Sequence, residues 1–512
     1  MQKKQKGWMM PGMLSERKEY SRQHPIAIID GFKRYIALLL LPLVRSLMLF
    51  TGDPYSWLRG VWLDVLVLLA IVAAGVVRWM FTGLAVGEDR VESCSGLLLP
   101  KKRQILLCNI SSVSVEHTWY FKPLRAVRVR IETDAGNKHT PDVRMLLRRE
   151  DAEKLCSRFS SQLDGGPVMV RRYEPRGWYV GILSLITSDS IGGAVFAATL
   201  ISQSGKLLGQ EAEDRLITSL TQLMQLVAFW LPPVAAVIAG VLLGGWLIDF
   251  VLNLIRHLGF QAVRRGGELY IRCGIVTVRE YLLSAGRVNF LQLRQSILTK
   301  IFGYYAGMVS CTGYGKEKNE QSVLLPAVGR DDLRRSLSLI LPELRPAPNR
   351  WRPPLRTLWR TVWPDILLCG LLLLGWRAAW RWLPSIRELV VFVGGMMVLP
   401  AGWHLAVRLW SFFHNGVGQR QNTFTFRAAR GYRLFTVVCR ADKVAKITVT
   451  RSIFQRKSRC ADLIVWLRSE KHTCIRVPNL SPEDINAFLS AFEEACAAVN
   501  VLPEEEFSDE FS

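Results

Sequence analysis

The sequence predicts a multi-pass α-helical membrane protein with six transmembrane helices in three hairpins, each followed by a small α+β domain. Three observations indicate this class. Half of the 512 residues are hydrophobic and only 21% are charged, and the apolar residues form long blocks. These blocks come in pairs, and a long polar stretch follows each pair. The formal net charge is +23, and most of the excess basic residues lie on one side of the blocks, whereas Arg377, Arg381 and Arg387 lie toward the other.

This composition also excludes two classes. A positive mean hydropathy of +0.17 argues against an intrinsically disordered basic chain and against a soluble nucleic-acid binder. We therefore expect no nucleic-acid partner.

Six segments are long and apolar enough to be transmembrane candidates, because a helix needs about 20 apolar residues to cross a bilayer core. They are residues 35–50, 61–81, 178–202, 229–252, 358–383 and 389–413. Short connections join them into hairpins over 35–81, 178–255 and 358–413. The alternative is six buried helices in the core of a large water-soluble protein. Uninterrupted apolar runs such as 366–376 argue against it, because they are difficult to shield from water on all sides.

Lysine and arginine residues set the orientation, since cytoplasmic flanks of membrane helices are enriched in both. The N-terminal tail, residues 1–34, is basic, and arginines also flank the cytoplasmic ends expected for the second and third hairpins. The connection at 203–215 instead carries Glu211, Glu213 and Asp214. We therefore expect both termini, the acidic tail 498–512 and all three polar domains to be cytoplasmic.

The polar stretches 82–165, 256–344 and 417–497 form an internal repeat. Each has a strand-like run ending in a glycine, namely Gly96, Gly274 and Gly431. A basic residue follows 26 positions later in each copy: Lys122, Lys300 and Lys457. Each copy closes with a helix that has acidic residues in its first turn. Short alternating strands and one C-terminal helix predict a small antiparallel β-barrel or roll.

At these motifs the sequence resembles a known family. The second copy reads Gly-Ile-Val-Thr-Val-Arg at 274–279, Ile-Phe-Gly at 301–303 and Thr-Gly at 312–313, and His24-Pro25 precedes the first hairpin. The chain is similar to bacterial membrane proteins with pleckstrin-homology-like (bacterial PH type-two) domains, in particular the three-copy YdbT-like family. The resemblance implies a bacterial plasma-membrane location and a companion small membrane protein with one PH-like domain. It also implies an envelope role such as tolerance to antimicrobial peptides.

Basic clusters inside the repeats are the candidate binding residues for membrane lipids, peptides or partner proteins. They are Lys101, Lys102, Arg103, Lys122, Arg279, Arg287, Lys300, Arg456 and Lys457. Basic loops beneath a bilayer attract anionic headgroups, at about 1 kcal/mol per residue. The alternative is that these charges serve only topology and solubility. The most favoured function is a non-enzymatic membrane scaffold or binding protein.

Two other functions stay open. Arg45 and Asp189 lie inside predicted spans, where ionisable groups are costly, and they indicate a transporter or channel-like protein. Helix association is the simpler interpretation of both residues. A membrane enzyme is disfavoured because no paired carboxylates or Ser/His arrangement recurs. No Cys-x-x-Cys or His-Glu-x-x-His motif occurs, so no metal or other cofactor is expected. The oligomeric state is open.

Overall fold

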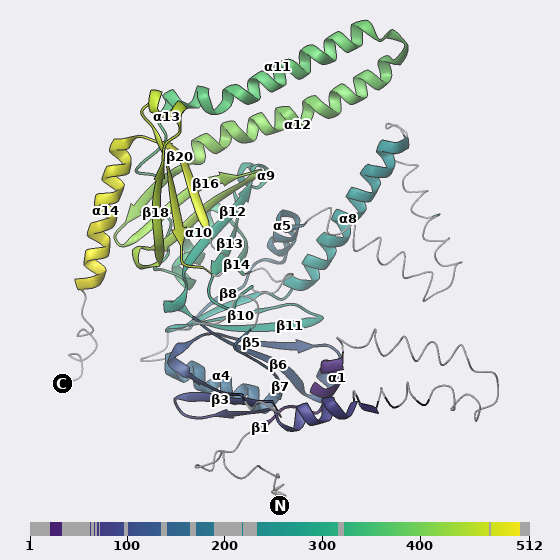
Figure 1. The fold of residues 1–512 in the computed structure, drawn as a ribbon, viewed down its shortest axis with the longest axis vertical. Coiled ribbons are helices and arrows are strands. Elements are labelled where there is room, and N and C mark those ends of the chain that lie inside the picture. Colours follow the sequence, from purple (N-terminus) through teal and green to yellow (C-terminus); the bar gives the residue numbers. More distant parts are fainter. Residues whose placement is uncertain are drawn as a thin grey trace, which may run out of the picture. The chain divides into compact units, whose positions relative to one another are not determined.

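A computed structural model describes residues 21–32, 72–96, 101–134, 141–163, 170–188, 233–315, 322–469 and 473–501, with the single residues 62, 66, 69, 70 and 218. The chain divides into two compact units, Met1–Gly166 and Pro167–Ser512. Each unit is described by itself. The first contains the first repeat, and the second contains the other two (Figure 1).

The first unit has two antiparallel strand sets and a closing helix. Its elements are β1 (Ser21–Arg22), α1 (Ala27–Phe32), a helical stretch at 72–80, β2 (Gly83–Val86), β3 (Arg90–Ser95), β4 (Lys101–Leu106), η1 (Leu107–Asn109), β5 (Ile110–Thr118), η2 (Lys122–Leu124), β6 (Ala126–Thr133), β7 (Val143–Arg148) and α4 (Arg149–Leu163). The first set has the order β1-β2-β3-β4. In the second set, β6 pairs with both β5 and β7.

The second repeat has the same sequence of elements within the second unit. They are β8 (Val170–Tyr173), α5 (Gly177–Thr187), α8 (Pro233–His257), β9 (Gln261–Arg265), β10 (Glu268–Cys273), β11 (Thr277–Ser284), η3 (Ala285–Arg287), β12 (Phe290–Ser296), α9 (Ile297–Ile301), β13 (Tyr304–Ser310), β14 (Val323–Gly329) and α10 (Arg330–Ile340).

The third repeat completes this unit. It comprises η4 (Leu355–Thr357), α11 (Leu358–Trp382), η5 (Pro384–Ile386), α12 (Arg387–His414), β15 (Gly416–Arg420), β16 (Thr423–Arg430), β17 (Arg433–Arg440), η6 (Ala441–Lys443), β18 (Val444–Thr450), α13 (Ile453–Lys457), β19 (Ala461–Leu467), β20 (Cys474–Leu480) and α14 (Pro482–Val501). The strands of each repeat lie within the three predicted ranges except β1, β8 and the first residue of β15, and α14 extends beyond 497.

In each repeat, the chain before the predicted hairpin pairs with the first strand after it. Ser21 of β1 pairs with Leu84 of β2, and Tyr173 of β8 pairs with Ala262 of β9. In the third repeat a single bridge joins Trp351 to Val417. We call these three pairings the strand clasps. A clasp thus holds the two ends of each predicted hairpin next to each other.

The second and third repeats share one sheet, which corrects the expectation of a separate barrel or roll for each copy. Its strand order is β14-β13-β12-β17-β16-β15, so β12 of one repeat pairs with β17 of the next. Side chains alternate along a strand. Leu291 and Val438 therefore join the core of the second repeat, whereas Phe290 and Cys439 join that of the third.

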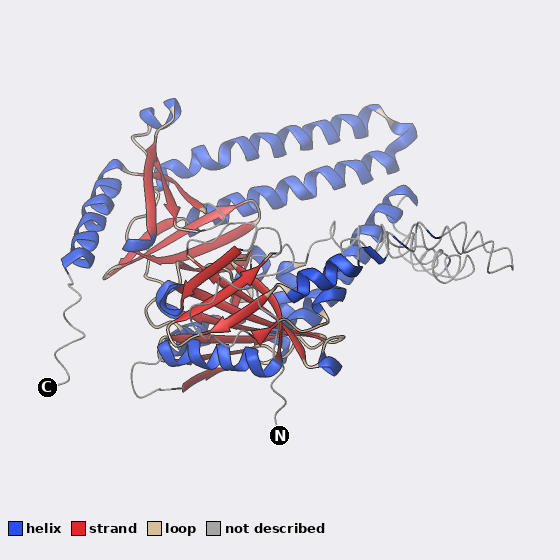
Figure 2. Cartoon of the chain, turned by 60° about the horizontal axis from the view of Figure 1, so that its bottom comes forward, coloured by secondary structure: helices blue, strands red, loops and turns tan. Residues whose placement is uncertain are grey.

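Among the described residues, two helices are long and apolar enough to span a membrane, Leu355–Trp382 and Val390–His414. They match the third predicted hairpin. Protein covers only 11% and 6% of their most apolar windows, unlike the core helices of a soluble protein. Both views show α11 and α12 side by side, projecting from the strands of the second unit (Figures 1 and 2).

The prediction of six spanning helices therefore goes beyond the structure, which describes two. Span 35–50 and part of 61–81 lie outside the described residues, as does 189–217. Helices α5 and α8 occupy parts of the second predicted hairpin.

Candidate functional site

A short helical turn carries the candidate basic residue of each repeat. The turns are η2, α9 and α13, and each is followed by a residue with a left-handed backbone: Arg125 (φ 51°), Gly303 (φ 74°) and Arg459 (φ 46°). The N–H of that residue donates to a carbonyl three positions earlier, that of Lys122, Lys300 or Arg456, over 3.1, 3.2 and 3.3 Å. Arg456, not Lys457, is therefore the counterpart of Lys122 and Lys300. The spacing of 26 residues from the glycine to the basic residue therefore holds for the first two copies, whereas in the third copy the equivalent residue comes one position earlier.

In the third repeat, α13 begins with a capping box. The Ser452 hydroxyl accepts from the Gln455 N–H, and the Gln455 side chain accepts from the Ser452 N–H at 2.8 Å. These reciprocal bonds satisfy N–H groups that have no partner within the helix. Gln455 is buried. The cap therefore fixes its side chain toward the interior of the domain.

Gln455 reaches a buried carboxylate, Asp462 on β19, which is 2% exposed. Its amide donates to Oδ1 of Asp462 at 2.5 Å, and the N–H of Asn479 donates to the same oxygen at 2.9 Å. The other oxygen accepts from Nε of Arg476 at 2.9 Å. A buried carboxylate is tolerated when donors surround it in this way. Asn479 itself has φ 60°, a conformation that asparagine adopts more readily than most residues.

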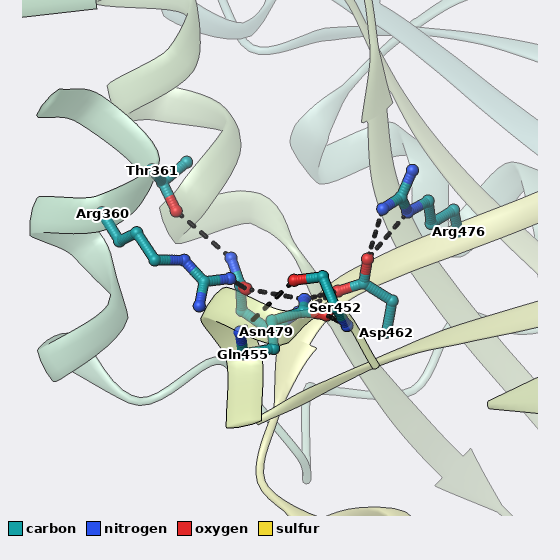
Figure 3. Close-up of polar contacts among 7 residues, drawn as sticks. All are labelled: Arg360, Thr361, Ser452, Gln455, Asp462, Arg476 and Asn479. Carbon is teal, nitrogen blue, oxygen red and sulfur yellow. Dashed lines mark hydrogen bonds and ion pairs between the residues drawn. The ribbon is translucent and has the colours of Figure 1, made fainter. Parts of the chain in front are cut away.

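The first turns of α11 join this network. Nη1 of Arg360 donates to Oγ of Ser458 at 2.8 Å, and Nη2 donates to Oδ1 of Asn479 at 2.7 Å. The Asn479 amide donates in turn to Oγ1 of Thr361 at 3.2 Å. Figure 3 shows the two α11 residues pointing toward Asn479, and beyond it Asp462 and Arg476. The third domain thus holds the start of its own hairpin through charge-assisted bonds.

The second repeat binds the other end of this hairpin. Nζ of Lys300, on α9, lies 3.3 Å from Nδ1 of His414 and 5.7 Å from the centre of the Trp410 ring. Because Nε2 of His414 faces the carbonyl of Phe435 at 3.2 Å, Nε2 carries the proton and Nδ1 accepts from Lys300. Burial, with a smaller effect from the Arg427 charge, lowers the pKa of Lys300 to about 8. Lys300 thus joins the α9 turn of the second repeat to the end of α12 in the third.

Between the two helices lies an ionic cluster near the cytoplasmic end expected for the hairpin. Asp365 of α11 is buried, and its carboxylate lies 3.2 Å from Nδ1 of His404 and 3.3 Å from Nε of Arg408, both on α12. Ionisable groups at membrane depth are normally paired with one another. The cluster fixes how α11 and α12 face each other.

The first-repeat cluster follows the edge strand β4. Lys102 lies 3.4 Å from the buried carboxylate of Glu92, and Nη1 of Arg103 donates to the carbonyl of Asp142. Lys101 and Lys122 are exposed. Two of these four predicted binding residues therefore have structural contacts within the domain.

The remaining predicted residues are not brought together. Arg279 lies near the start of β11 and Arg287 in η3, beyond its other end, so they form no single patch. Arg45 and Asp189 lie outside the described residues, and so does the side chain of Lys457. Within the described part of the chain, no cluster of His, Cys, Asp or Glu could hold a metal ion.

The sequence prediction missed the network around Asp462. In the sequence, Arg360 is one of the arginines that flank the third hairpin, and no motif marks Asp462, Arg476 or Asn479. One local signal was available, since Ser452 and Gln455 have the capping-box spacing. The pairing of Arg360 with Asn479 joins residues far apart in sequence and leaves no such pattern.

Comparisons with known proteins agree with this architecture. Residues 36–162 match the family described as "Bacterial PH domain". The chain is 24% identical over 383 residues to "UPF0699 transmembrane protein YdbT" of Bacillus subtilis (strain 168), which covers 69% of this chain and 75% of that protein. No solved structure matches the chain.

Proposed function

Because this chain is a YdbT-like membrane protein that carries bacterial PH domains, we propose that it is a non-enzymatic scaffold. Three PH-like domains are held against the cytoplasmic face of a bacterial plasma membrane, where they bind anionic lipid headgroups. Six helices in three hairpins anchor them, with both termini cytoplasmic. A companion protein with one PH-like domain and a role in antimicrobial-peptide tolerance belong to the same proposal.

The strand clasps are the observation that carries this proposal. A clasp ties the chain entering a hairpin to the chain leaving it, as Tyr173 and Ala262 do across the second hairpin. The domain built on that strand therefore begins directly at the point where the hairpin enters the bilayer. Basic side chains on a domain so placed lie within the reach of the negative surface potential of the inner leaflet.

Lipid selectivity around the whole protein tests the proposal. The full chain is extracted from bacterial membranes in copolymer-bounded discs, and the lipids retained are compared with the bulk membrane by mass spectrometry. The whole chain is needed because β12 and β17 share a sheet, so that an isolated second repeat would expose the edge of β12. We expect anionic lipids to be enriched.

A charge-matched pair of variants identifies the residues responsible. The test variant carries Lys101→Gln, Lys122→Gln and Arg456→Gln, all at exposed positions on the strand edge and the short turns. The control variant carries Lys154→Gln, Arg334→Gln and Arg468→Gln, which are exposed on α4, on α10 and after β19. Enrichment should fall in the first variant only. Retained lipid that matches the bulk membrane in the unmodified protein would leave peptides or partner proteins as the ligands.

A further inference from the structure

The short turn of each repeat exposes large apolar side chains beside its basic residue. The exposed fractions are 63% for Trp119, 50% for Leu124, 58% for Ile301, 71% for Phe302 and 81% for Ile453. Trp119 and Ile453 occupy the same position, six residues before Arg125 and Arg459 respectively. We call these five residues the apolar tips. Exposed side chains of this size, recurring at one place in three repeats, indicate a surface that is covered in use.

The lengths of α11 and α12 place two of these turns at the level of the lipid headgroups. The helices have 25 and 28 residues, which at about 1.5 Å per residue gives lengths of about 37 and 42 Å. A hydrocarbon core is about 30 Å thick, so the end turns of both helices, including the first turn of α11 and the last turns of α12, extend into the headgroup layer. The α13 turn contacts α11 at Arg360, and α9 contacts α12 at Trp410 and His414. All three contact residues lie in these end turns.

Aromatic residues mark the same level on the hairpins. Trp359 and Trp363 of α11 have ring centres 5.1 Å apart and ring planes tilted by 39°, and both are exposed. In the second repeat, the exposed ring of Trp178, at the start of α5, lies 5.2 Å from Tyr304, which follows the α9 turn. Tryptophan is enriched where membrane helices cross the headgroup layer.

The first unit has the same arrangement. Ile26 shares a small core with Phe121, which directly precedes η2, and Ala27 of α1 packs against this core. Helix α1 leads into the first predicted hairpin. In addition, Nε1 of Trp79 donates to the carbonyl of Gln23 at 2.8 Å, which joins the end of the 72–80 helix to the chain just before α1. The η2 turn therefore also lies at the base of its hairpin.

We propose that the apolar tips insert into the headgroup layer of the leaflet that faces the domains, so that each domain is fixed on the bilayer by its hairpin and by its short turn. An apolar tip next to a basic residue suits this layer, because the apolar part enters the acyl boundary while the cation meets anionic headgroups. Lys122 and Arg456 are the exposed cations; Lys300 is held by His414. This inference rests on the proposed function and adds an insertion depth to it.

Site-specific quenching in the full-length protein tests the insertion. A fluorescent amino acid replaces Phe302 or Ile453, and in the matched control it replaces Glu494, an exposed residue on α14. Each protein is placed in nanodiscs containing phosphatidylglycerol and a lipid with a nitroxide on its headgroup. Iodide serves as the aqueous quencher. All three positions are exposed, so the substitutions leave the fold intact.

We expect the nitroxide lipid to quench the fluorophore at positions 302 and 453 but not at position 494. Iodide should quench the fluorophore at position 494 but not at positions 302 and 453. Equal iodide access at all three positions would overturn the insertion. If anionic lipids are still enriched around the protein in that case, the proposed function survives without it. The opposite outcome is also distinguishable. If the nitroxide lipid quenches positions 302 and 453 but the lipids retained around the protein match the bulk membrane, the headgroup-binding function is contradicted and the insertion stands.

Replacing an apolar tip with a charged side chain gives a second test of the insertion. Phe302→Asp and Ile453→Asp place a carboxylate at the expected headgroup level, where like charges repel. In the nitroxide discs, a fluorophore at Leu124 should then keep its quenching, because its own repeat is unchanged. A reporter at Tyr304 should lose quenching in Phe302→Asp. Unchanged quenching at Tyr304 would contradict insertion of the α9 turn.

Discussion

The guanidinium of Arg360, in the first turns of α11, donates to the side-chain oxygen of Asn479 on β20 over 2.7 Å. This bond joins a membrane helix to the last strand of the third PH-like domain. A second group, Oγ of Ser458, accepts from the same guanidinium at 2.8 Å. The hairpin and the domain are thus joined through one side chain as well as through the backbone, and this predicts how the protein responds to substitution.

Removing the guanidinium should loosen this junction. Arg360→Met keeps the apolar stem and loses both charge-assisted bonds, which should lower the free energy of unfolding by about 1–3 kcal/mol. The loss is measured by denaturant titration of the protein in mixed micelles. Arg356→Met, four residues earlier at an exposed position, is the control and should change little. Equal effects of the two substitutions would argue against the junction.

Asn479 should be sensitive to backbone conformation as well as to its amide. Both Asn479→Ala and Asn479→Gly remove the bonds to Arg360 and Thr361. Only alanine is strained at φ 60°, by about 1 kcal/mol or more. The alanine variant should therefore melt at a lower temperature than the glycine variant. A glycine variant that melts at the same temperature or lower would show that the left-handed backbone is not what matters there.

Lys300 should titrate far below an ordinary lysine. Its pKa is lowered to about 8 in the folded protein, whereas the ordinary value is 10.5. Between these pH values the unfolded chain binds more protons than the folded one, so the contribution of Lys300 to stability rises with pH across this window. Competitive acylation read by mass spectrometry should show Lys300 becoming reactive near pH 8. Lys300→Met should remove that part of the pH dependence; a variant that keeps it would assign the effect to another group.

The cluster in the third hairpin should show energetic coupling. In a double-mutant cycle of Asp365→Asn and Arg408→Met, the two effects should depart from additivity by about 0.5–2 kcal/mol, because each residue loses the other's charge. The measurement is unfolding of the hairpin in detergent. Asp365→Asn combined with Arg377→Met, three turns away on α11, should be additive. Additivity in both cycles would mean that the pairing with Arg408 contributes nothing measurable.

The apolar runs of the third hairpin could be predicted almost to the residue. The expected spans 358–383 and 389–413 correspond to helices at Leu358–Trp382 and Arg387–His414. Length and hydropathy suffice there, because the bilayer imposes both. The repeat was also visible, since three hairpins each precede a similar set of short strands.

The strand pairings could not be predicted. Ser21–Arg22 has only two residues and Val170–Tyr173 reads Val-Arg-Arg-Tyr, so neither sequence has the apolar–polar alternation that predicts a half-buried strand. Their partners lie beyond a whole hairpin in sequence. The shared β12–β17 pair is equally non-local. The offset at Lys457 has a simpler origin: counting from Gly431 assumes loops of equal length, whereas the left-handed residue Arg459 sets the true position of the turn.

The central claim is that the domains of all three repeats lie on one side of the membrane and that the hairpins reach across it. Single cysteines at exposed Lys154, Arg334, Glu494 and Ser385, in a cysteine-free chain, test it by labelling spheroplasts with a membrane-impermeant maleimide. We predict labelling of Ser385→Cys, at the tip of the third hairpin, in intact spheroplasts. The other three should react only after permeabilisation. Labelling of any domain position from outside, or protection of position 385, would contradict the account.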